Sequence, residues 1–310
     1  THYSTNDIKF GLFGDPTLRL NAPTYRAQLD TINGNPASVA AQLKALGRGK
    51  IEGSIRKLDG SLWSDYSGRL LMTVYDSRKE IPVPEWFNFT FTIPGGIIYK
   101  GENTISNGKF SASFFVPRDI SYENNRARIT VYFSSPNSDG SGYTENIFVG
   151  GTDSAAAPDE EGPRISIYLD TRSFRAGDVV GDSPLLLIDY FDEHGINTAS
   201  GGIGHRLEVR IDDQPTPIDL TNYYKGKPDS YQEGSVEYHL SNLTEGKHVV
   251  RAKAWDVYNN SSTTETTFEI AATTQLRVSN VYNYPNPFSR STTFTFLQNQ
   301  LVPIDVDIKI

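Results

Sequence analysis

The chain has 310 residues, a formal net charge of -8 and a pI near 5.2. This acidic balance disfavours a phosphate-binding surface, and no cluster of Lys and Arg alternates with aromatic residues, so nucleic acid is not expected as a partner. There is no cysteine, which excludes disulfides, thiolate metal ligands and cysteine nucleophiles from this chain. No apolar run approaches the roughly 20 residues that a transmembrane helix needs, so the chain is not expected to cross a membrane itself.

The composition predicts a mainly β fold. Tyr (17), Phe (16), Gly (26) and Pro (17) are plentiful, whereas long helical stretches of Ala, Leu, Glu and Lys are nearly absent. At roughly 100 to 200 residues per domain, the length predicts two or three domains.

The first two segments of the chain predict a strand and a connector. Residues 1–21 hold an apolar run that the Gly14-Asp15-Pro16 turn interrupts, and it could be a first strand. Residues 22–47 are predicted to be a connector with one short helix, for which Asn35 is the cap and Pro36 the first helical residue. Three apolar residues would share one face of this helix, namely Val39, Leu43 and Leu46. Gly47 would end the helix.

Residues 48–152 and 163–272 each predict a β-sandwich, because short strands alternate with turn signals. The strands expected in the first are Lys50–Leu58, Arg69–Tyr75, Phe87–Ile93, Ile97–Tyr99, Lys109–Val116, Ala127–Phe133 and Tyr143–Val149. Those expected in the second are Arg164–Leu169, Leu185–Tyr190, Arg206–Ile211, Ser235–Leu240, Lys247–Asp256 and Thr264–Ile270. Residues 153–162 are rich in Ala, Asp and Glu, and they predict a linker that acts as a hinge.

Residues 273–310 predict the start of a third β-sandwich. Thr292–Leu297 and Ile304–Ile310 both alternate apolar and polar residues, which is typical of strands with one buried face. The second of these runs would be an unpaired edge, so we expect the domain to continue past Ile310.

Two histidines next to Gly-rich turns are the first candidate site. His194 and His205 could meet as a metal pair or a proton-transfer site, completed by a carboxylate of Asp192 or Asp189. The alternative is that the glycines serve turn geometry and the imidazoles bond nearby backbone.

Clustered carboxylates and two tryptophans give two weaker candidates. Asp212 with Asp213, and Asp153 with Asp159, could hold Ca²⁺, although a complete calcium-binding loop is missing and solvated turns explain them as well. No other cofactor is expected. Trp86 and Trp255 could form a sugar-stacking platform, against the alternative of core packing.

Several phrases of the sequence resemble one known family when taken together in order. They are Val116-Pro117-Arg118-Asp119-Ile120, Val149-Gly150-Gly151, Gly162-Pro163-Arg164-Ile165, His194-Gly195-Ile196-Asn197, Gly201-Gly202-Ile203-Gly204-His205, Ala254-Trp255-Asp256-Val257-Tyr258-Asn259-Asn260 and Asn283-Tyr284-Pro285-Asn286-Pro287-Phe288. This series is similar to the post-catalytic region of PorU-type sortases of the type IX secretion system of Bacteroidota, which belong to the gingipain-like cysteine peptidases. The stretch Gly14 to Leu20 likewise resembles the end of their caspase-like catalytic domain.

The resemblance implies tandem immunoglobulin-like β-sandwiches followed by a C-terminal sorting-type domain. It also implies a noncatalytic scaffold and docking part of a cell-surface, outer-membrane-associated sortase, with the catalytic Cys and His upstream of Thr1. The implied partners are a PorV-type outer-membrane β-barrel, other secretion components and exported cargo. The docking residues would be Asn283, Tyr284, Pro285, Asn286, Pro287 and Phe288. The alternatives are part of another gingipain-like peptidase or a cargo protein, and a carbohydrate-binding or adhesin module.

Overall fold

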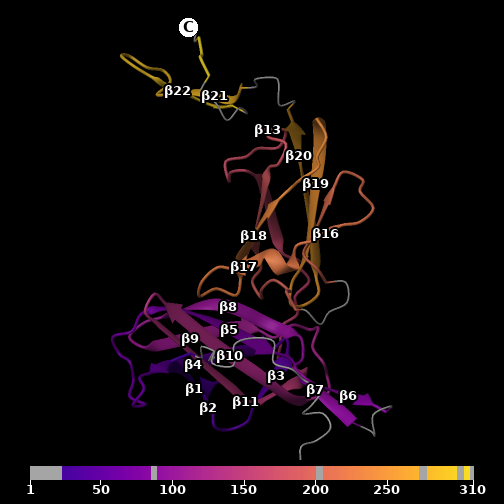
Figure 1. The fold of residues 1–310 in the computed structure, drawn as a ribbon. Helices are drawn as coiled ribbons and strands as arrows, with labels where there is room; N and C mark the ends of the chain where they lie inside the picture. Colours follow the sequence, from indigo (N-terminus) through magenta and orange to yellow (C-terminus); the bar gives the residue numbers. More distant parts are fainter. Residues whose placement is uncertain (1–22, 85–88, 200–204, 272–277, 299–303, 308–310) are drawn as a thin grey trace, which may run out of the picture.

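The structure is a computed structural model that describes residues 23–84, 89–199, 205–271, 278–298 and 304–307. Figure 1 shows two β-domains stacked end to end, with a separate pair of strands beyond the second domain. The segment 1–21, the glycines Gly201, Gly202 and Gly204, and Trp86 lie outside the described residues.

The first domain contains one large curved sheet and a projecting hairpin. Seven strands of the sheet follow the order β8-β5-β10-β11-β1-β4-β9, while β2 pairs with β1 and β3 pairs with β11. The bounds are β1 (Tyr25–Ile32), β2 (Asn35–Pro36), β3 (Ala41–Ala45), β4 (Arg48–Arg56), β5 (Gly68–Tyr75), β6 (Lys79–Val83), β7 (Phe89–Ile93), β8 (Ile97–Ile105), β9 (Lys109–Phe115), β10 (Asn125–Ser135) and β11 (Ser138–Thr152).

The sheet curls because its two outermost strands are joined by a tight turn. β8 and β9 end the strand order on opposite sides, yet Asn107 and Gly108 connect them with positive φ angles of 51° and 69°. Ser106 and Lys109 exchange two backbone hydrogen bonds of 2.9 Å across this turn. The sheet therefore wraps around a single core, in which Phe114 and Phe133 are each only 1% exposed.

The helix expected between Asn35 and Gly47 is wrong, since this segment forms β2 and β3 instead. The residues follow the two-residue period of a strand and not the 3.6-residue period of a helix. Buried Ala41, Leu43 and Ala45 alternate with exposed Gln42 and Lys44. β3 pairs in parallel with the end of β11, so its backbone groups are satisfied by the sheet. The predicted connector thus supplies strands to the first domain.

The second domain has the strand order of an immunoglobulin-like sandwich. One sheet runs β12-β14-β18-β17 and the other β13-β20-β19-β15-β16, with β13 parallel to β20. Named A to G in chain order, these are the ABED and A′GFCC′ sheets of that fold. The bounds are β12 (Arg164–Leu169), β13 (Val179–Val180), β14 (Leu185–Phe191), β15 (Glu208–Ile211), β16 (Ile218–Asp219), a 3₁₀ turn η1 (Thr221–Tyr223), β17 (Tyr224–Gly226), β18 (Glu233–His239), β19 (Gly246–Trp255) and β20 (Ser261–Ile270).

The expected mainly β, sandwich-type fold class is confirmed, and the described residues contain no α-helix. The second core is lined by alternating residues of both sheets, including fully buried Leu186, Ile188, Val209 and Val250. No helix in the described part of the chain is long and apolar enough to cross a membrane.

The hairpin of β6 and β7 projects from the first domain (Figure 1). Ile81 pairs with Phe91, and Val83 pairs with Phe89. Directly paired residues share one face, so this face is apolar, while Glu80 and Thr92 lie on the other. Phe89 and Phe91 are about half exposed, at 52% and 49%. The hairpin therefore presents an apolar face to solvent.

The last described strands form an isolated pair, β21 (Val278–Tyr284) with β22 (Thr293–Gln298). β22 matches the strand predicted at Thr292–Leu297. The strand predicted at Ile304–Ile310 is not formed over its described part, residues 304–307.

The first core predicts a sharp difference between two aromatic substitutions. Phe114→Ala removes a buried ring that stacks on Tyr99 at 4.4 Å between centroids, and it should lower the free energy of unfolding by about 3–5 kcal/mol. Tyr132→Ala, at a side chain 43% exposed on β10, should change it by less than about 0.5 kcal/mol. Urea unfolding monitored by fluorescence measures both, and equal losses would contradict this account of the core.

Candidate functional site

A group of hydrogen-bonded polar residues lies between the two domains, and we call this region the junction. Its centre is a turn of the second domain, residues 256–260, that enters the first domain. Val257 and Tyr258 are 4% and 2% exposed and belong to the first domain's core, although they follow β19 of the second. Arg118 donates its backbone N–H to the Val257 carbonyl at 2.8 Å. Apolar burial therefore joins the two domains.

Val257 and Tyr258 form an apolar wedge in the first domain's core. The turn that carries this wedge is held by its own side chains. The carboxylate of fully buried Asp256 accepts the backbone N–H of Asn260 at 2.7 Å and its side-chain amide at 2.8 Å. Asn259 adopts a positive φ of 71°, a conformation that Asn tolerates better than most residues. The Asp-Val-Tyr-Asn-Asn sequence is therefore suited to hold Val257 and Tyr258 outward.

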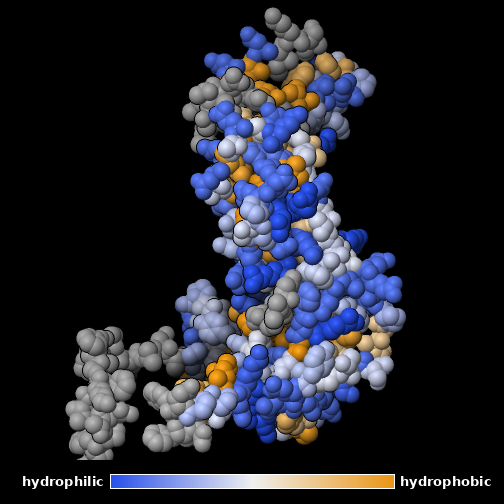
Figure 2. Space-filling view, turned by 90° about the vertical axis from the view of Figure 1, so that its right-hand side faces the viewer, coloured by the Kyte–Doolittle hydropathy of each residue, from blue (hydrophilic) through white to orange (hydrophobic). Residues whose placement is uncertain are grey.

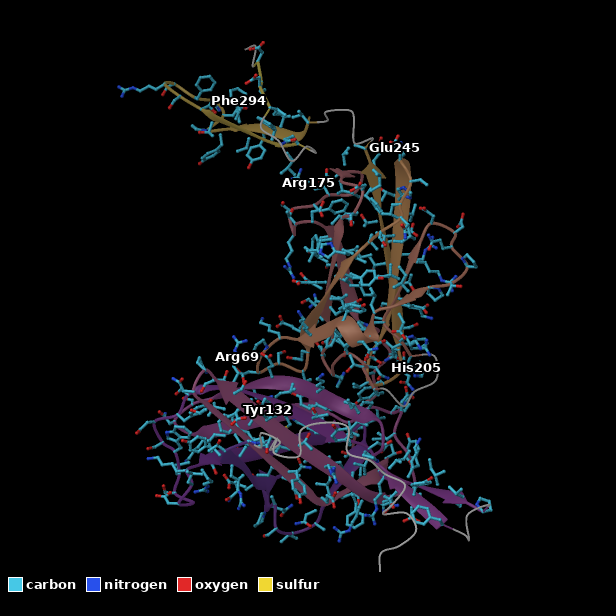
Figure 3. The ribbon with its side chains drawn as sticks, in the orientation of Figure 1. Arg69, Tyr132, Arg175, His205, Glu245 and Phe294 are labelled. Carbon is cyan, nitrogen blue, oxygen red and sulfur yellow. The ribbon has the colours of Figure 1, made fainter. Side chains whose placement is uncertain are left out.

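Asp119 of the first domain collects three side chains of the second. Its carboxylate accepts hydrogen bonds from the amides of Asn259 at 2.8 Å and Asn197 at 3.1 Å. The same carboxylate contacts Nδ1 of His205, which Figure 3 places at the junction. All of these groups lie in a partly buried setting, where hydrogen bonds to a charged acceptor are strong.

A second carboxylate, from the second domain, bonds residues of the first domain. Asp229, in the loop after β17, accepts the backbone N–H of Thr104 at 2.7 Å and also its hydroxyl. Its own N–H donates to the Glu102 carbonyl at 2.9 Å. The loop thereby caps part of the β8 edge of the first domain.

The linker is held by both domains. Asp153 donates its N–H to the Ala45 carbonyl at 2.9 Å, and Ala156 packs against the first core. At the other end, the Asp159 carbonyl accepts the Asn260 amide at 3.0 Å. These contacts argue against the free hinge expected from the sequence of residues 153–162.

One group of side chains at the junction has the composition of a metal site. Asp159, Asp192 and His194 offer ligand atoms that all lie within 4.8 Å of one another. Asp159 and His194 Nδ1 are 2.7 Å apart, and Asp192 accepts the backbone N–H groups of His194 and Gly195 at 2.8 and 2.9 Å. These three residues could hold a divalent cation, but each of them already has a hydrogen-bond partner without one.

Burial and like charges perturb this group. Burial raises the pKa of Asp192 to about 6, and the nearby carboxylates of Asp256 and Asp159 add to the shift. Burial likewise raises the pKa of Asp256 above its usual range. The two hydrogen bonds from His194 and Gly195 act in the opposite sense but are outweighed. The junction therefore holds carboxyl groups that resist ionisation.

The remaining predicted metal residues are not brought together. His194 bonds Asp159, whereas His205 bonds Asp119, so the two histidines belong to separate networks. Asp189 makes a bidentate ion pair with Arg172 at 2.8 Å. Asp212 bonds His248, and Asp213 is exposed in the following turn.

His248 is a structural histidine. It is 6% exposed and bonds Asp212 through Nδ1 and the Thr244 carbonyl through Nε2, at 2.8 and 2.7 Å. Although burial opposes its charged form, these two hydrogen bonds raise its pKa above the usual value.

Trp255 does not offer a free ring for sugar stacking. Lys253 Nζ lies 4.5 Å from the centroid of its ring, and the His205 ring lies 4.4 Å away. By contrast, Tyr284 and Phe288 of the predicted docking segment are exposed, at 76% and 43%. Asn283 and Asn286 bond each other through their side chains at 3.2 Å.

Sequence reasoning missed Asp119, Asp229 and the apolar hairpin face. The first two pair with residues 78 or more positions away, so no local pattern reveals them. The hairpin did carry a signal, since Phe89, Phe91 and Ile93 alternate with threonines on a strand that was expected.

These observations define a mainly β protein of two docked domains, of which the second is immunoglobulin-like. Among solved structures, the chain is similar to dimeric latent PorU from Porphyromonas gingivalis, with 29% sequence identity and a TM-score of 0.54. The match covers 93% of this chain and 28% of that chain. It supports a relationship to PorU and shows that this chain spans little more than a quarter of that protein's length.

Two further similarities are much weaker. The native conformation of α2-macroglobulin from E. coli shares 11% identity at a TM-score of 0.26, over 83% of this chain and 17% of that chain. The Ig1-2 module of the Drosophila receptor phosphatase DLAR shares 9% at a TM-score of 0.18, over 80% and 100%. No protein-family model matches the chain, and no curated protein matches it either.

The Asp119 network predicts that one substitution loosens the junction. Asp119→Asn removes the charged acceptor of three side chains, and it should weaken docking by about 1–3 kcal/mol. Limited proteolysis should then cleave within residues 153–162 faster than in the parent chain. Asp182→Asn, an exposed site with the same change of charge, is the control. Equal cleavage of the two variants would contradict the role of Asp119.

The raised pKa of Asp192 predicts a pH dependence of stability. The folded state takes up a proton near pH 6 and the unfolded state near its ordinary value of 3.8, so stability should fall as pH rises from about 4 to about 6. Asp192→Asn can still accept both backbone N–H groups without a charge. At pH 7.5 this variant should have a higher melting temperature than the parent chain, because its free energy of unfolding should be higher by on the order of 1 kcal/mol. Its melting temperature should also vary less with pH. Thermal melts from pH 4 to 8 measure this, and an unchanged profile would contradict it.

Proposed function

We propose that this chain is the noncatalytic scaffold and docking part of a cell-surface sortase of the type IX secretion system. The observation that carries the proposal is the similarity to PorU over 93% of the chain at 29% identity. With no cysteine, the chain supplies no thiolate for a gingipain-like peptidase, and that chemistry belongs to another part of such a protein.

The junction supports the scaffold role. The buried wedge of Val257 and Tyr258 connects the two cores, and the carboxylates of Asp119 and Asp229 act as two clamps between the domains. Such a connection can hold distant surfaces at a fixed separation. Exposed apolar surfaces lie far apart in Figure 1, on the β6–β7 hairpin and on the β21–β22 pair. Such surfaces are typical of protein interaction sites.

The partners of this role are a PorV-type outer-membrane β-barrel, other secretion components and exported cargo, at the cell surface. The docking contact is the segment from Asn283 to Phe288, where Tyr284 and Phe288 present rings to solvent. Exposed aromatic anchors of this kind dominate many interfaces. The alternative of a carbohydrate-binding module loses support because Trp255 is flanked by Lys253 and His205.

The test is copurification from outer membranes of the organism that carries the gene. The tagged native protein should bring down the PorV-type barrel, and Tyr284→Ala with Phe288→Ala should reduce its recovery at least about tenfold. The control replaces two exposed tyrosines of the first domain, Tyr132→Ala with Tyr143→Ala. No recovery of the barrel, or equal recovery with both double variants, would contradict the proposed docking.

A further inference from the structure

A groove of about 1000 Å³ runs between the two domains, beside the junction. Its first-domain wall comes from β5 and β8, and its second-domain wall comes from β14, η1, β17 and β18. Figure 3 labels Arg69 on the first-domain wall, on the other side of the junction from His205. The groove is open to solvent and shares no residue with the Asp159, Asp192 and His194 group.

The charge of the groove is opposite to that of the chain. Five cationic and three anionic side chains line it, whereas the chain as a whole carries -8. The three carboxylates are already taken, in the pairs Arg69–Glu102 at 3.2 Å, Arg172–Asp189 at 2.8 Å and Lys227–Glu233 at 2.8 Å. Two positive charges therefore remain.

Those charges belong to Lys100 on β8 and Lys225 on β17, which lie on opposite walls. Both are exposed, and neither has an acidic partner within the described residues. A ligand lying along the groove meets one free ammonium group from each domain, which favours a ligand with more than one negative charge.

The walls favour an extended peptide over a sugar or a nucleic acid. The groove is lined by Tyr190 and Tyr224, but Tyr190 is only 2% exposed and the two rings pack on each other at 6.1 Å between centroids. Stacking on sugars or bases needs an exposed ring face. β17, in contrast, is the outermost strand of its sheet among the described strands, so its outer edge is a template for an added strand.

We propose that this groove binds an extended acidic segment of a polypeptide, which lies along β17 and places carboxylates at Lys100 and Lys225. Alternate residues of a bound strand point to the same side, so acidic residues two positions apart suit both lysines. This binding does not depend on the sortase assignment, since it rests on groove shape and charge alone.

The test is fluorescence anisotropy with a labelled eight-residue peptide of alternating glutamate and threonine. The intact chain should bind it at about 50 mM salt and much more weakly at about 500 mM. Lys100→Gln with Lys225→Gln should weaken binding at least about tenfold. The matched control, Lys44→Gln with Lys57→Gln, removes the same charge at exposed sites outside the groove and should leave binding unchanged.

Four results would overturn the proposal: no binding at low salt, equal loss in both double variants, equal binding of a glutamine–threonine peptide, or binding of a sulfated oligosaccharide in place of the peptide. Circular dichroism melts of each variant show that the fold is retained, since all four lysines are exposed. The probe contains no secretion component, so its outcome is independent of the barrel copurification.

Discussion

The arrangement of this molecule depends on the insertion of Val257 and Tyr258 into the core of the other domain. A turn of the second domain projects these two apolar side chains, and they fill part of the first domain's core. Because these residues are buried, the polar groups beside them must find partners. Asp119 supplies them for Asn197, His205 and Asn259. The domain arrangement, the pinned linker and the groove all follow from this contact.

The face drawn in Figure 2 is mainly hydrophilic, with hydrophobic atoms confined to small areas. Half of the large hydrophobic residues that are exposed in the described part of the chain lie on two isolated strand pairs, β6–β7 and β21–β22. Two-stranded ribbons are marginal in water without a partner for one face. A rigid, polar body with apolar ends is the form that a scaffold between partners requires.

Much of the fold could be predicted from sequence, because period-2 alternation is local. β12 falls at Arg164–Leu169 as expected, and β19 and β20 lie within a few residues of their predicted ranges. The segment at Asn35 was read wrongly because a cap signal and three apolar residues outweighed the alternation of Ala41, Leu43 and Ala45. The site was predicted less well: His194 was expected to meet His205, with Asp192 or Asp189 completing the site. Only Asp192 lies beside His194, whose direct partner is Asp159 of the linker. Contacts between domains follow no sequence period, so the junction could not be predicted from the sequence alone.

The most direct test of the account is ¹⁵N relaxation of the deuterated chain. The absence of cysteine removes disulfide-linked species as a source of slow tumbling. If the wedge and the two carboxylate clamps hold, amides in β4 and β10 and amides in β14 and β19 must report one rotational correlation time, that of a single body. Two distinct and shorter correlation times, one for each domain, would contradict the claim that the domains are docked.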